Sequence, residues 1–171
     1  MLNIHGNSRW PFAIAVLLMS VAVTPAHADD DDDDDSGSKN GRKPLVVNAR
    51  WIDECGSCHM AFPPRFLSAE SWRAMMGGLD KHFGSNASVD AADAAEIGGF
   101  LEKNASSRNR MSSKGNEPPL RITETRWFQS EHRKVADRWK DTRVKSPANC
   151  AACHTKADSG GFGERDIKVP R

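Results

Sequence analysis

The four cysteines of this 171-residue chain all lie in two copies of one pattern, Cys-x-x-Cys-His. The copies are Cys55-Gly56-Ser57-Cys58-His59 and Cys150-Ala151-Ala152-Cys153-His154. Side chains three residues apart on a helical turn face the same way. The two thiols of each copy can therefore bond to the two vinyl groups of one haem, and the histidine that follows can bind the iron as proximal ligand. The sequence predicts two covalently bound haem c groups.

The predicted attachment residues are Cys55, Cys58, Cys150 and Cys153, and the predicted proximal ligands are His59 and His154. A redox dithiol would follow a strand in a βαβ pattern, which neither copy shows. A four-cysteine zinc ribbon fits less well, because 91 residues separate Cys58 from Cys150 and a histidine directly follows each pair. The haem interpretation is therefore favoured over both.

The occupant of the second axial position of each iron determines its function. A protein side chain there favours electron transfer, whereas an open position lets the iron bind a gas or peroxide. Of six histidines, His5 and His27 fall in a predicted signal peptide and two are proximal, which leaves His82 and His132. Two spare histidines match two vacant positions, so we predict His82 as the distal ligand of haem 1 and His132 as that of haem 2. Crossed ligation between the two halves stays open as the alternative.

Methionine is the rival distal ligand, and it would raise the haem potential. The candidates are Met60, Met75, Met76 and Met111. Met60 adjoins a proximal ligand, Met75 and Met76 are expected to pack within a helix, and Met111 lies in a polar segment. Histidine is therefore the favoured ligand type at both sites.

Residues 1–28 resemble a secretion signal: Arg9 precedes an apolar stretch over residues 11–23, and Ala26-His27-Ala28 matches an A-x-A cleavage site. We expect cleavage after Ala28 and a periplasmic protein, since c-type haem is attached outside the bacterial inner membrane. The stretch is short for a membrane span, although an uncleaved anchor is the alternative.

Residues 29–35 are seven consecutive aspartates. They repel one another, so residues 29–46 are interpreted as a disordered acidic arm and linker. The other 136 mature residues contain 23 basic and 16 acidic side chains. Such a body could steer an acidic redox partner, and nothing in it indicates nucleic-acid binding.

The pattern predicts a mostly α fold with two haem-binding halves, long loops and little or no strand. The halves are residues 47–104 and 123–171, and the polar residues 105–122 are interpreted as a linker. We expect a first helix from about Val47 into Cys55 and a second one capped by Ser68.

Two further helices are expected, one in each half. The first is capped by Ser88 and ends near Asn104. The second is capped by Thr123 and runs through His132 to Val135. Large apolar residues are sparse, so the haems are expected to supply much of the core.

Four segments together resemble the bacterial dihaem cytochrome c family. They are Trp72-Arg73-Ala74-Met75-Met76, Leu79-Asp80-Lys81-His82-Phe83-Gly84, Trp127 to Glu131-His132, and Asn149-Cys150-Ala151-Ala152-Cys153-His154. The resemblance implies a periplasmic electron carrier in which His59 and His154 are proximal ligands and His82 and His132 distal ones. It also implies partners of two kinds, an oxygen-binding monohaem cytochrome c and a membrane cytochrome b.

We therefore predict an electron carrier with two low-spin bis-histidine haems, which is not an enzyme and not an integral membrane protein after signal cleavage. The alternative is a dihaem enzyme or gas-binding protein in which one iron is open to peroxide or a diatomic ligand. The chain offers no obvious second histidine or arginine pair for such a pocket.

Overall fold

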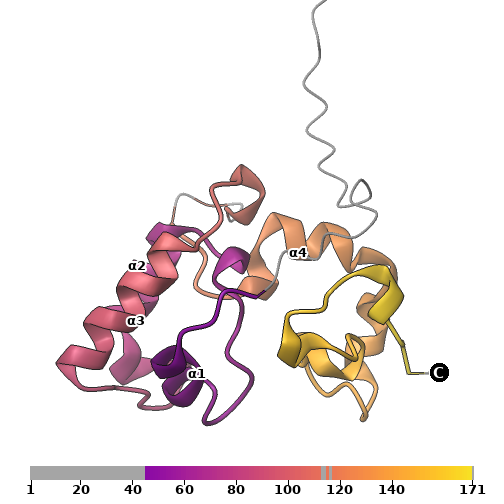
Figure 1. The fold of residues 1–171 in the computed structure, drawn as a ribbon. Coiled ribbons are helices and arrows are strands. Elements are labelled where there is room, and N and C mark those ends of the chain that lie inside the picture. Colours follow the sequence, from indigo (N-terminus) through magenta and orange to yellow (C-terminus); the bar gives the residue numbers. More distant parts are fainter. Residues whose placement is uncertain (1–44, 113–114, 116, 171) are drawn as a thin grey trace, which may run out of the picture. The chain divides into compact units, whose positions relative to one another are not determined.

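The computed structural model of the protein describes residues 45–112, 115 and 117–170. Within these ranges the regular structure is helical, and pairing of extended segments is limited to isolated bridges (Figure 1). The predicted mostly α fold is confirmed. The α-helices are α1 (Ala49–Cys55), α2 (Ala69–Met76), α3 (Ala91–Lys103) and α4 (Arg126–Glu131).

Short 3-10 helices make up the rest of the regular structure. They span Pro64–Phe66, Leu79–Lys81, Asn109–Met111, Ile122–Glu124, Arg133–Lys140, Cys150–Ala152, Ala157–Ser159 and Glu164–Asp166. No helix in the described residues is long and apolar enough to cross a membrane. The predicted signal peptide and aspartate run lie outside the described residues.

Two of the predicted helix starts are correct. Asn48 caps α1, where its side-chain oxygen accepts a 2.8 Å hydrogen bond from the Trp51 N–H. Ser68 caps α2 as expected, because its hydroxyl accepts from the Ser71 N–H at 3.1 Å. Both side chains satisfy a backbone donor that has no partner within its helix.

The predicted cap Ser88 is wrong, because α3 is capped by Asp90. The Asp90 carboxylate accepts from two N–H groups of the first turn, at 2.9 Å each, whereas the Ser88 N–H donates to Asn86 in the preceding loop. The predicted cap Thr123 is also wrong. It lies within the Ile122–Glu124 turn, and Thr125 caps α4.

The core of the first half consists of Trp51, Leu67, Trp72, Ile97 and Leu101, all buried. Helix α3 contacts both α1 and α2 (Figure 1). The indole of Trp72 also donates a 2.7 Å hydrogen bond to the Pro64 carbonyl, which ties α2 to the turn that precedes it. These residues fix the end of α1, where the first Cys-x-x-Cys-His copy begins.

The second half has fewer buried side chains, chiefly Thr125, Phe128, Val144 and Ala157. Met111, in the predicted linker, is also buried, with 4% of its surface exposed. The 3-10 turn that contains it contacts α4. The Arg126 N–H also donates to the Ser112 carbonyl at 3.2 Å. Part of residues 105–122 therefore packs as structure of its own.

Candidate haem-binding site

The first Cys-x-x-Cys-His copy starts on the last residue of α1, so that Cys55 is half-buried and Cys58 exposed. The second copy starts on the 3-10 turn Cys150–Ala152. The C-terminal segment supports it, because the Lys168 N–H donates to the Cys153 carbonyl at 2.8 Å.

All four cysteines are described and none forms a disulfide. Burial raises the pKa of Cys55, with Glu54 adding to the effect, and burial raises the pKa of Cys150 to about 11. A catalytic dithiol needs the opposite shift, since the thiolate is its reactive form. Within the described ranges no three side chains of the metal-binding types cluster.

The structure brings His82 to His59, the histidine of the first copy. Their ring centroids are 6.1 Å apart and their planes differ by 27°. It brings His132 to His154 in the second copy, with centroids 6.0 Å apart and planes 68° apart. Each spare histidine therefore lies beside the nearer proximal histidine in the sequence.

These separations match two imidazoles on opposite sides of one metal ion. An imidazole nitrogen binds a metal at about 2 Å and the ring centre lies roughly 1 Å behind it, so the two ring centres should be roughly 6 Å apart. The spacing of both pairs therefore fits an iron between them.

Hydrogen bonds from Nδ1 hold two of the four histidine rings. His59 donates from Nδ1 to the Met60 carbonyl at 2.8 Å, and His132 from Nδ1 to the Phe128 carbonyl at 2.9 Å. Such bonds fix the ring and leave Nε2 for a metal. Nδ1 of His82 and of His154 is buried without a hydrogen-bond partner among the described residues, so no such bond fixes the tautomer of these two rings.

Burial favours the neutral form of one histidine in each pair, because it lowers the pKa of that histidine. Burial lowers the pKa of His82, and the nearby His59 and Arg121 lower it further. Burial also lowers the pKa of His154, with a contribution from His132. A neutral imidazole is the form that binds iron, so both shifts favour ligation at pH 7.

A tight turn after His82 sets the direction of its side chain. Phe83 and Gly84 both have positive φ, 48° and 98°, and the Ser85 N–H closes the turn by donating to the His82 carbonyl at 3.0 Å. A phenylalanine in this region is strained. Arg121 holds it, because its guanidinium lies 3.7 Å from the centre of the Phe83 ring.

His132 is presented by the end of α4. The predicted helix to Val135 is wrong in its second part: α4 stops at Glu131, His132 has φ −97° and ψ 6°, and a 3-10 helix follows. The His132 ring stacks on Phe128, with centroids 4.1 Å apart and planes 18° apart. Their spacing of four residues on the helix could have indicated this contact from the sequence.

Sequence reasoning missed a group of aromatic contacts beside the second copy. Phe162 lies 5.2 Å from His154 and meets Phe66 edge-on at 4.7 Å. Arg65 stacks against both phenylalanines and donates to the Gly160 carbonyl at 3.2 Å. These residues lie far apart in the sequence, which carries no signal for the contact.

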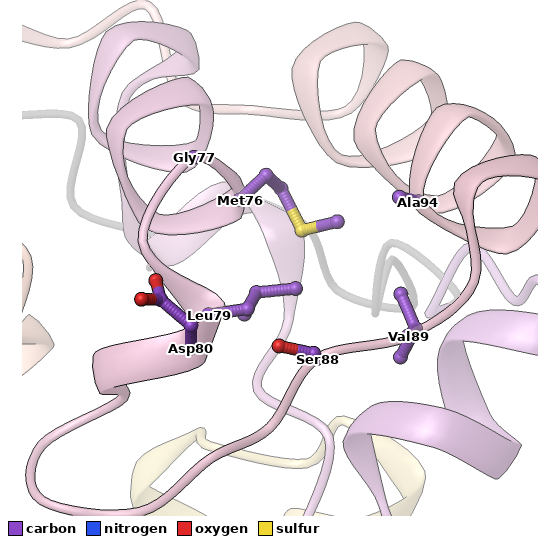
Figure 2. A pocket seen from close by; sticks show the side chains of 7 residues that line it. All are labelled: Met76, Gly77, Leu79, Asp80, Ser88, Val89 and Ala94. Carbon is purple, nitrogen blue, oxygen red and sulfur yellow. The ribbon is translucent and has the colours of Figure 1, made fainter.

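The methionines occupy other roles in the structure. Met75 and Met76 pack against the core of the first half, Met111 is buried beside α4, and the Met60 carbonyl accepts the bond from His59. Met76 also lines a small hollow between the end of α2 and the start of α3, together with Leu79 and Val89 (Figure 2). None of the predicted ligands lines this hollow.

The fold and the two histidine pairs define a class of small helical proteins built around two c-type haem sites. The chain matches the model of the dihaem cytochrome c family over residues 51–162. The chain therefore belongs to the dihaem cytochrome c family, and its cofactors are two haem c groups.

Solved structures agree with this assignment. The chain is 36% identical to a dihaem cytochrome c of Shewanella baltica, over 72% of this chain and 93% of that one, with a TM-score of 0.63. Two structures of the dihaem cytochrome from Rhodobacter sphaeroides are 37% and 38% identical, with TM-scores of 0.62 and 0.57. The two matches cover 70% and 69% of this chain and 99% of each relative's chain. No curated protein sequence matches the chain significantly.

Proposed function

We propose that the protein is a one-electron carrier whose two haems are both bis-histidine ligated. In this proposal His59 and His82 bind the iron of haem 1, and His154 and His132 that of haem 2. Cys55 and Cys58 attach haem 1, and Cys150 and Cys153 attach haem 2. The observation that carries the proposal is the spacing of about 6 Å in both histidine pairs.

Each haem, when bound, supplies an iron that alternates between the ferric and ferrous states. The chain supplies the rest. Its four histidines would hold the two irons and would keep oxygen and peroxide from binding them. The carbonyls of Met60 and Phe128 hold two of the rings, and burial lowers the pKa of His82 and of His154 and so favours their neutral forms. This arrangement suits outer-sphere transfer without substrate chemistry.

We also propose a periplasmic location, with cleavage after Ala28. Membership of a c-type cytochrome family and the signal-like residues 1–28 support this location. The family resemblance further suggests two redox partners, an oxygen-binding monohaem cytochrome c and a membrane cytochrome b.

Electron paramagnetic resonance and optical spectra of both redox states test the ligation. We expect two low-spin ferric haems and no carbon monoxide binding to the reduced protein. His82→Ala and His132→Ala should each turn one haem high-spin and leave the other low-spin. His82→Met is the matched control, because it restores a sixth ligand and should instead raise the potential of haem 1.

A high-spin haem or carbon monoxide binding in the unaltered protein would contradict the carrier proposal. It would favour the alternative of a dihaem enzyme or gas-binding protein. If neither alanine variant produced a high-spin haem, the assignment of the distal ligands would be wrong.

A further inference from the structure

The two haem-binding halves carry opposite charge. Residues 47–104 contain five basic and eight acidic side chains, a formal charge of −3. Residues 123–171 contain eleven basic and seven acidic side chains, a formal charge of +4. Each haem adds the same two propionates, so the difference between the halves persists in the holoprotein. A partner that approaches the molecule therefore meets two electrostatically distinct ends.

Much of the positive charge lies on the segment that follows His132. The 3-10 helix Arg133–Lys140 is fixed on its inner side, because Trp139 stacks 5.9 Å from Phe128 and Phe128 stacks on His132. Trp139 of this helix therefore belongs to the same aromatic group as the proposed distal histidine of haem 2. Arg133 and Lys134 directly follow that histidine in the sequence.

Four cations of this region define a surface that we name the basic surface. They are Arg133, Lys134, Lys140 and Lys145, all exposed. None of the four makes an ion pair with another described residue, whereas Arg138 and Arg143 in the same segment pair with Asp137 and Asp141 at 3.9 and 2.6 Å. The basic surface therefore keeps its charge available to a partner.

The first half neutralises more of its positive charge internally. Arg50 pairs with Asp93 at 3.2 Å, and Arg73 pairs with Glu102 at 2.6 Å. Acidic side chains outnumber basic ones in residues 47–104, and Arg121, which lies on Phe83 beside His82, is paired with Glu124 at 3.7 Å. An acidic partner therefore meets less free positive charge near haem 1. The same partner is attracted to the basic surface beside haem 2.

We propose that the basic surface docks an acidic redox protein and that this partner exchanges electrons through haem 2. The inference rests on the proposed carrier function and adds the side of the molecule at which one partner binds. Complementary charge at an interface raises the association rate and orients the encounter more than it raises affinity. The signature is therefore a rate that depends on salt and on these particular cations.

Stopped-flow reduction of the mature holoprotein by the hydroquinone of flavodoxin, a small acidic flavoprotein, tests the proposal. Lys134→Gln with Lys140→Gln removes two charges from the basic surface. Lys81→Gln with Lys103→Gln is the matched control, since it removes two lysines of the first half that are also exposed. At low ionic strength we expect the first pair to slow reduction about three- to tenfold and the control by less than about twofold.

Salt supplies a second criterion. At about 0.5 M salt, where charges are screened beyond a few ångströms, the rates of all three proteins should converge. Equal slowing by both double variants at low salt would mean that only net charge matters, and it would overturn the docking surface.

A neutral quinol donor separates this inference from the carrier function itself. All three proteins should accept electrons from it at the same rate. If even the unaltered protein accepted none, the carrier function would fail. If the basic surface changed binding to phosphatidylglycerol vesicles but not the rate with flavodoxin, the surface would serve a membrane and the proposal would be wrong.

Discussion

The imidazole planes of His59 and His82 lie within 27° of each other, whereas those of His132 and His154 differ by 68°. An imidazole donates π density to the iron d orbital perpendicular to its ring. Two of the iron d orbitals can interact with the rings in this way. Two nearly parallel rings act on the same one of these orbitals and separate the two in energy. Two nearly perpendicular rings act on both orbitals almost equally. With the proposed bis-histidine ligation, the two haems should differ electronically although their ligands are of the same type.

Electron paramagnetic resonance of the oxidised protein should show two different low-spin signals. We expect the larger maximal g value from haem 2, because its orbitals are split less. His82→Ala assigns the signals, since it should remove the low-spin signal of haem 1 and leave the one with the larger g value. Two identical low-spin signals would contradict the ring orientations.

Arg121→Gln should lower the reduction potential of haem 1 and leave that of haem 2 unchanged. The guanidinium lies on Phe83, the neighbour of His82, and its charge favours the less positive ferrous iron. We expect a fall of roughly 30–60 mV, a three- to tenfold change in the one-electron equilibrium constant. Spectroelectrochemical titration of both haems measures it.

Two further variants separate charge from packing at this position. Arg121→Lys keeps the charge and should retain most of the potential. Glu124 pairs with Arg121 at 3.7 Å and is left unpaired in the glutamine variant, so adding Glu124→Gln should restore part of the loss. Equal shifts of both haems in Arg121→Gln would rule out a local effect.

Phe162→Ala should disturb haem 2 selectively. The ring packs on His154 and meets Phe66 edge-on, so its removal frees the proximal histidine and costs about 2–3 kcal/mol of unfolding free energy. Denaturant unfolding and the low-spin signal of haem 2 report the two effects. Phe100→Ala is the control, because Phe100 packs on Trp51 in the first half; it should leave the haem 2 signal unchanged.

Asp141 should titrate far below an ordinary aspartate. The Arg143 side chain donates to both carboxylate oxygens, at 2.9 and 2.6 Å, and these bonds with that of the Arg143 N–H lower the pKa of Asp141 from 3.8 to about 2. Because the folded pKa is depressed, this stabilisation is present above pH 3.8 and is lost as the pH falls through about 2. The carboxyl ¹³C shift in the reduced, diamagnetic protein measures the pKa.

Arg143→Gln is the matched variant for this titration. It should return the Asp141 pKa most of the way toward 3.8, since the two side-chain hydrogen bonds disappear. An unchanged midpoint in this variant would show that the arginine is not the cause.

Local chemistry explains which parts of the fold could be predicted. The spacing within Cys-x-x-Cys-His, the Ser68 cap and the end of α3 near Asn104 depend on residues close in sequence, and the structure agrees with the last two. Ser88 and Thr123 failed as caps because a better-placed Asp90 and Thr125 lie two residues further on. Several hydroxyl and carboxylate side chains near a helix start compete, and sequence alone ranks them poorly.

Contacts between distant segments could not be predicted. The stacking of Arg65 on Phe162 joins residues 97 positions apart, and Met111 is buried although its neighbours are polar. The turn at Phe83 is equally hidden, because phenylalanine rarely takes positive φ. Such a conformation depends on tertiary contacts like that of Arg121.

The way in which the backbone holds the histidines should affect the rate of electron transfer. Backbone carbonyls anchor His59 and His132, and a closed turn carries His82, so three of the four proposed ligands would have little freedom to move when the iron charge changes. The nuclear rearrangement that accompanies each transfer should then be small. Electron exchange in such a molecule would be set by how closely a partner approaches and not by a slow change of shape.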